Sequence, residues 1–124
     1  MNVVDSSGWI EYLAKGANAA FFTPPIRDLQ HLIVPTICIY EVFKRLLSER
    51  DEESALLAVG IMSEGREVAL DRGLALDAAQ ISRELGLVMA DSIILAAART
   101  NNAILWTQDE HFKDLSGVKF IPKK

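Results

Sequence analysis

The sequence predicts an α/β fold with three layers: a central, mainly parallel sheet of four to five short strands, with helices on both faces. Short apolar runs alternate along the chain with amphipathic helical segments, which is typical of parallel strands joined by right-handed crossovers. The runs are apolar almost throughout, as expected when both faces of a sheet are covered. The length of 124 residues fits one domain with a single core, spanning residues 1–124.

The strands are expected at five apolar runs. Two of these runs lead into acidic residues: Asp5 directly follows the first, and Asp109 follows the fourth after Thr107 and Gln108. The C-terminal run is the weakest pattern of the five, so the expected count is four to five. The runs are residues 3–4, 32–34, 67–70, 103–106 and 118–121.

Helices are expected between these strands. Ser6 and Ser7 are suitable caps for the first helix. Its apolar stripe consists of Trp9, Ile10 and Leu13. Residues 19–22 fit a short helix, whereas Pro24 and Pro25 predict extended backbone at and just before themselves.

Thr36 opens the next helix, which carries Glu41 in its middle, about two turns from the start. Residues 48–53 read as a charged turn and the beginning of a further helix, and we interpret their charges as solvated. The buried stripe predicted for that further helix consists of Ala55, Leu56, Val59 and Met62.

Two more helices are expected in the C-terminal half. The first ends at Gly86. Its apolar stripe consists of Leu74, Ala78, Ile81 and Leu85. The second carries Asp91 in its first turn and continues to about Asn101. The apolar residues on the same face as Asp91 are Ile94, Leu95 and Ala98. A carboxylate in such apolar surroundings is costly unless something pairs with it, so Asp91 is a candidate for function.

The composition restricts the possible classes of function. The net charge of −4 argues against a broad basic surface for nucleic acid, although it does not exclude a nuclease whose acids hold metal cations. No apolar run is long enough to span a membrane, and no signal peptide is recognisable, so we expect a cytoplasmic protein. Cys38 is expected to pack in the core, and neither it nor His31 and His111 show the spacing of a zinc site.

Four acidic side chains are expected to meet in one cleft. Asp5 and Asp109 follow strands, and the carboxyl ends of parallel strands meet at the edge of the sheet where sites form. Asp91 begins a helix at that same edge, and Glu41 has a side chain long enough to reach inward. Their repulsion is relieved by a hard divalent cation such as Mg²⁺ or Mn²⁺, which suits phosphodiester hydrolysis. The sequence contains no Walker loop and no GxGxxG motif.

These motifs resemble those of PIN-domain ribonucleases, and in particular the VapC-type toxins of toxin–antitoxin pairs. The resemblance covers nearly the whole chain, except that residues 51–72 carry no family signature. It implies a Mg²⁺- or Mn²⁺-dependent endoribonuclease with RNA as substrate, usually a homodimer, which a cognate antitoxin silences. The motifs that carry it are Asp5-Ser6-Ser7, Glu41 in a helix after a strand, Ala90-Asp91-Ser92, Thr107-Gln108-Asp109 and the ending Glu110-His111-Phe112.

The residues around the quartet have competing interpretations. Ser6 and Thr107 are predicted to support the site through their hydroxyls, although capping and turn formation explain them as well. Glu110 is an alternative to Asp109 as the acidic site residue after the fourth strand, and we prefer Asp109. His111 is interpreted as a structural turn residue beside Phe112 rather than a general base. Lys44, Arg45 and Arg99 are candidates for phosphate contacts, with an ordinary surface role as the alternative.

Two other functions compete with the toxin ribonuclease. A PIN nuclease in RNA processing would share its chemistry, and a neighbouring antitoxin gene would distinguish the two. A phospho-receiver domain of similar length would need paired acids after its first strand and a lysine after its last. Here Ser6 follows Asp5, and nothing pairs with Asp71 after the third strand, so we regard this alternative as inferior.

Overall fold

All five predicted strands form, and they pair in one sheet that is parallel throughout. The computed structural model describes residues 1–124. The strand order is β3-β2-β1-β4-β5, and Val3 lies opposite Ile33 on one side and Leu105 on the other. The elements in chain order are β1 (Asn2–Val4), α1 (Ser6–Leu13), α2 (Ala19–Arg27), η1 (Leu29–His31), β2 (Leu32–Pro35), α3 (Thr36–Glu49), α4 (Glu52–Met62), β3 (Arg66–Val68), α5 (Arg72–Leu85), α6 (Met89–Thr100), β4 (Ile104–Thr107), η2 (Glu110–Phe112) and β5 (Val118–Phe120).

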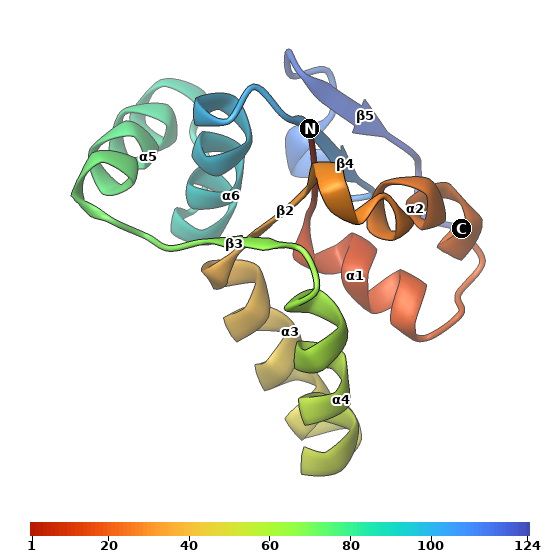
Figure 1. The fold of residues 1–124 in the computed structure, drawn as a ribbon. Coiled ribbons are helices and arrows are strands. Elements are labelled where there is room, and N and C mark those ends of the chain that lie inside the picture. The colour runs from red at the N-terminus through yellow and green to blue at the C-terminus, as the bar shows by residue number, and fades with distance from the viewer.

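The helices are arranged in pairs around this sheet. In Figure 1, α1 and α2 lie on one side of the strands, and α5 and α6 lie on the other. The helices α3 and α4 pack against each other and extend together away from the sheet (Figure 1). Because α3 starts immediately after β2, this pair begins at the carboxyl edge of the sheet.

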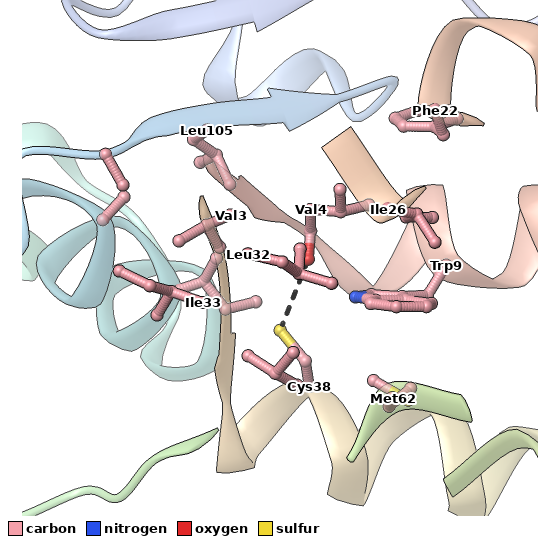
Figure 2. Packing of buried hydrophobic residues seen from close by; sticks show 14 of the residues in the cluster. Val3, Val4, Trp9, Phe22, Ile26, Leu32, Ile33, Cys38, Met62 and Leu105 are labelled. Carbon is pink, nitrogen blue, oxygen red and sulfur yellow. Dashed lines mark hydrogen bonds between the residues drawn. The ribbon is translucent and has the colours of Figure 1, made fainter. Parts of the chain in front are cut away.

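The core forms where the strands meet the two helical layers. Figure 2 shows side chains from β1, β2 and β4 packed with residues of α1, α2, α3 and α4. Cys38 is fully buried, as predicted, and its Sγ lies 3.9 Å from the carbonyl oxygen of Val4 (Figure 2). Burial raises the pKa of the Cys38 thiol far above its ordinary value, so this cysteine is an inert core residue.

The prediction of extended backbone at Pro24 and Pro25 is wrong. Both prolines lie inside α2, where each lacks the amide hydrogen that would bond to the preceding turn. The helix forms nevertheless because it buries an apolar face against the core. That face consists of Phe22, Pro25 and Ile26. The Thr23 hydroxyl, which donates to the Ala19 carbonyl oxygen at 2.9 Å, supplies an additional bond within the helix.

Two further expectations need correction. The side chain that caps α1 is that of Asp5, which accepts from the Gly8 amide, whereas Ser6 and Ser7 lie in the first turn. Leu56 was expected on the buried face of α4 but is half exposed, because Ala55, Ala58 and Met62 form the face that packs inward. Neither change alters the path of the chain at the carboxyl edge.

The topology also decides against the receiver alternative. Receiver domains have the strand order 2-1-3-4-5, whereas the order here begins at β3 and places β1 in the centre. Asp71 caps α5 by accepting from the Leu74 amide at 2.9 Å, which is a structural role. None of the helices combines the length and the apolar character needed to cross a lipid bilayer.

Candidate functional site

The four acids predicted from the sequence line one cleft at the carboxyl edge of the sheet. They arrive from four separate segments: the end of β1, the middle of α3, the first turn of α6 and the loop after β4. The cleft has a volume of about 300 Å³. Its lining residues are Asp5, Ser6, Ser7, Ile10, Glu41, Arg45, Asp91, Ile94, Asp109 and Lys123.

Asp5 forms the floor of this cleft and is only 2% exposed. Its carboxylate accepts hydrogen bonds from the Gly8 amide at 2.9 Å, the Ser7 hydroxyl at 2.9 Å and the Thr107 hydroxyl at 2.7 Å. Burial raises the pKa of Asp5 from 3.8 to about 6, although these three donors oppose the change. The carboxylate is therefore held in a fixed orientation at a cost in solvation.

The two predicted supporting hydroxyls both contact a carboxylate. Ser6 donates to Glu41 Oε1 at 2.6 Å, which fixes the glutamate of α3 against the start of α1. Thr107 bonds to Asp5 and also accepts from the Asp109 amide at 2.9 Å. Thr107 thus links two acids of the cleft across the neighbouring strands β1 and β4, because Val4 and Trp106 are paired immediately before them.

Asp91 lies in the first turn of α6, as predicted, but it does not cap the helix. The cap residue is Val88, and the only side chain that bonds to the Asp91 carboxylate is His111, whose Nδ1 lies 3.1 Å from Oδ2. Burial raises the pKa of Asp91, and repulsion from Asp109 raises it further, whereas His111 opposes both effects. The like charges of Asp91 and Asp109 are thus held close together in a partly desolvated place.

The structure distinguishes Asp109 from Glu110. Asp109 faces the cleft, and its Oδ1 accepts from the His111 amide at 2.9 Å. Glu110 is exposed and does not line the cleft. His111, interpreted from the sequence as a turn residue, does lie in the short helix η2, but its ring points to Asp91 and Asp109. Sequence reasoning missed this orientation because it depends on how the loop after β4 meets α6.

Two cationic side chains also line the cleft. Arg45, weighed as a phosphate contact, extends there from α3, whereas Lys44 does not line it. Lys123 was not anticipated, since it lies beyond the last strand. The buried Asn18 side chain positions the C-terminal segment that carries Lys123. Its Nδ2 donates to the Pro122 carbonyl oxygen at 3.0 Å and to Gln108 Oε1 at 2.9 Å.

The donor set fits a hard divalent cation. Four carboxylates and two cationic side chains line the cleft, which leaves an excess of two negative charges when all are ionised. The pKa values of Asp5 and Asp91 are raised mainly by burial and further by repulsion from Asp109, so their ionised forms are disfavoured in the metal-free cleft. Oxygen ligands of this kind are preferred by Mg²⁺ and Mn²⁺. The arrangement can therefore hold a metal ion beside two cations that suit an anionic substrate.

Comparisons with known proteins agree with this architecture. The PIN domain family matches residues 3–118 of the chain. A toxin–antitoxin complex from Klebsiella pneumoniae contains a similar fold, with 21% identity, a TM-score of 0.78 and 96% of each chain covered. VapC20 of Mycobacterium tuberculosis, described as a sarcin-ricin loop cleaving toxin, has 17% identity and a TM-score of 0.77, with 95% of this chain and 97% of that chain covered. DNA-bound VapBC from Salmonella typhimurium has 17% identity and a TM-score of 0.76, with 98% of each chain covered. No curated protein matches the sequence significantly.

Proposed function

Because the chain belongs to the PIN domain family, we propose that it is a metal-dependent endoribonuclease that hydrolyses RNA phosphodiester bonds and acts as the toxin of a toxin–antitoxin pair. The observation that carries this proposal is the meeting of Asp5, Glu41, Asp91 and Asp109 at one cleft. These acids are the only polar cluster in the cleft suited to phosphodiester chemistry, since it contains no cysteine and no serine paired with a histidine.

In this proposal the four carboxylates would hold Mg²⁺ or Mn²⁺. When bound, such an ion supplies Lewis acidity toward water and toward the phosphate. The protein contributes a fixed arrangement of ligands. Asp5 is immobilised by its three donors, and Glu41 is oriented by Ser6. Arg45 and Lys123 would bind the negatively charged phosphate from the rim of the cleft, where the acids alone would repel it.

The decisive experiment incubates the purified protein with a panel of RNAs in Mg²⁺, in Mn²⁺ and in excess chelator. We expect internal cleavage with either metal and none with chelator. Asp91→Asn should abolish cleavage, whereas Asp77→Asn, which neutralises an exposed acid of α5 outside the cleft, should retain it. Cleavage that continues undiminished in chelator would contradict the proposal.

The proposed partner is a cognate antitoxin, and the proposed oligomer is a homodimer. The antitoxin is supported by the similar folds in toxin–antitoxin complexes, including VapBC-1 from nontypeable Haemophilus influenzae. Adding the product of a small neighbouring gene should suppress RNA cleavage. If no neighbouring gene product affects cleavage, the RNA-processing alternative replaces the toxin role while the nuclease chemistry stands.

A further inference from the structure

The histidine beside the acids has the geometry of a metal ligand. His111 Nδ1 lies 3.1 Å from Asp91 Oδ2 and 3.4 Å from Asp109 Oδ1. One ligand atom from each of these three residues lies within 4.8 Å of the other two. In an octahedral site with bonds of about 2.1 Å, adjacent ligands are about 3.0 Å apart and opposite ligands about 4.2 Å apart. The three side chains thus span nearly the right space around a single ion.

The backbone holds the imidazole in this place. The His111 amide donates to Asp109 Oδ1 at 2.9 Å, and the next residue, Phe112, is fully buried in the core. The side chain itself is 65% exposed. Without metal, Nδ1 donates its hydrogen to the Asp91 carboxylate. Nε2 makes no hydrogen bond to the protein, so the tautomer that carries the proton on Nε2, facing water, presents the Nδ1 lone pair to a metal.

We propose that His111 is a direct nitrogen ligand of the divalent metal and makes the site selective for transition metals over Mg²⁺. This inference rests on the proposed function, because it assumes that the acidic cleft binds a metal. Imidazole nitrogen adds little to Mg²⁺ binding, whereas its contribution grows through Mn²⁺, Co²⁺ and Ni²⁺. An all-carboxylate site would not show this gradient to the same extent.

The chain provides a matched control. His31 is the only other histidine, and its Nδ1 lies 3.0 Å from Asp28 in an exposed pair. This pair precedes β2, at the edge of the sheet opposite the cleft, and it has no second acid. His31→Gln therefore removes a histidine–aspartate contact of similar geometry without touching the acidic cleft.

The experiment loads tag-free protein with Mn²⁺ and records pulsed electron paramagnetic resonance, which detects nitrogen bound to the ion. Wild type and His31→Gln should show nitrogen coupling, and His111→Gln should not. Bound Mn²⁺ without nitrogen coupling in wild type would overturn the inference, as would coupling that persists in His111→Gln. Because the ring is exposed, we expect His111→Gln to fold, and its melting curve checks this.

Metal titrations supply a second readout. His111→Gln should weaken Mg²⁺ binding by less than about twofold and Ni²⁺ binding by roughly tenfold or more, with Mn²⁺ and Co²⁺ between them. An equal loss of affinity for every metal would overturn the inference, since His111 would then act only through its hydrogen bond to Asp91.

RNA cleavage measured with the same samples separates the two proposals. If wild type cleaves RNA with Mn²⁺ bound but shows no nitrogen coupling, His111 is not a metal ligand and the nuclease proposal stands. If wild type neither binds metal nor cleaves RNA, both proposals are rejected.

Discussion

Asp5 combines a role in helix capping with a place in the cleft. It caps α1 by accepting from the Gly8 amide, and it also faces the cleft. Its ionised form is destabilised by burial more than its three hydrogen bonds stabilise it, which is why its pKa lies near 6. A side chain selected only as a cap would be expected on the surface, where capping carries no such cost. The burial of Asp5 therefore favours a role in the cleft.

The pKa of Asp5 predicts how stability changes with pH in metal-free protein. Well below pH 3.8 this group is protonated in both the folded and the unfolded chain, so the free energy of unfolding does not depend on its titration there. As the pH rises to about 6, the unfolded chain releases the proton first, so the free energy of unfolding falls by an amount on the order of 3 kcal/mol. Asp5→Asn lacks this titration. Urea unfolding at several pH values should show that the free energy of unfolding falls more steeply with rising pH in wild type than in Asp5→Asn. Parallel pH profiles of the two proteins would contradict the raised pKa of Asp5.

Asp91→Asn should separate function from stability. The substitution is nearly isosteric and removes one of two repelling charges, while no capping bond is lost because Asp91 does not cap α6. We expect the metal-free variant to melt at the same temperature as wild type or higher, with a gain of up to about 1 kcal/mol in the free energy of unfolding. Added Mg²⁺ should stabilise wild type by mass action and the variant much less.

Thermal melting with and without Mg²⁺ tests this prediction, with Asp77→Asn as the control for loss of an exposed charge. An Asp91→Asn protein that melts well below wild type in chelator would show that the bond to His111 is chiefly structural.

At the scale of elements, the sequence predicted the secondary structure best where the local pattern of apolar residues matches their burial in the fold. Strands β1, β2 and β4 were recognisable as short apolar runs, of which β2 is buried throughout. Asp5 was found because it directly follows β1, and Asp109 because it follows β4 after a single intervening residue, Gln108. The helical Pro24–Pro25 segment was missed because packing against the core outweighed local preference. Lys123 was missed because its position depends on the bond between Asn18 and Pro122, residues distant in sequence.

The close approach of α1 to the core gives a prediction about an element. A Cβ at Gly8 would lie 2.6 Å from Phe22 Cε1 and 2.7 Å from Val4 Cγ1, so Gly8→Ala must push α1 away from α2 and β1. We expect a loss of about 1–3 kcal/mol in unfolding free energy. Cleavage should also fall, because the first turn of α1 carries Ser6 and with it the orientation of Glu41.

Gly60→Ala is the matched control for this prediction. Gly60 lies within α4, and a Cβ at this position would meet no atom within 4 Å, so alanine should stabilise the helix by roughly 0.5–1 kcal/mol. Urea denaturation of both variants measures the difference. Equal effects of the two substitutions would show that α1 is free to move.

At the scale of the whole molecule, several large apolar side chains stay exposed after folding, and two of the regions that they form are relevant to association. The first comprises Leu56 and Leu57 on α4, next to the acidic residues Glu52 and Glu53. The second is a mainly apolar pocket of about 370 Å³ between α5 and α6, at which Val88 and Met89 are exposed by 62% and 71%. The second region offers both protruding side chains and a hollow, as a self-complementary interface between two copies requires.

We therefore predict a homodimer that forms through the region between α5 and α6. Light scattering should give about twice the mass of the 13.7 kDa chain. Val88→Asp should shift the protein toward monomer, because a charge would be buried against apolar surface. This substitution should not impair folding, since Val88 is the cap residue of α6 and aspartate is a good cap.

Leu57→Asp on α4 should leave the mass unchanged. A wild-type monomer at high concentration contradicts dimerisation, and dissociation by Leu57→Asp alone places the interface on α4 instead.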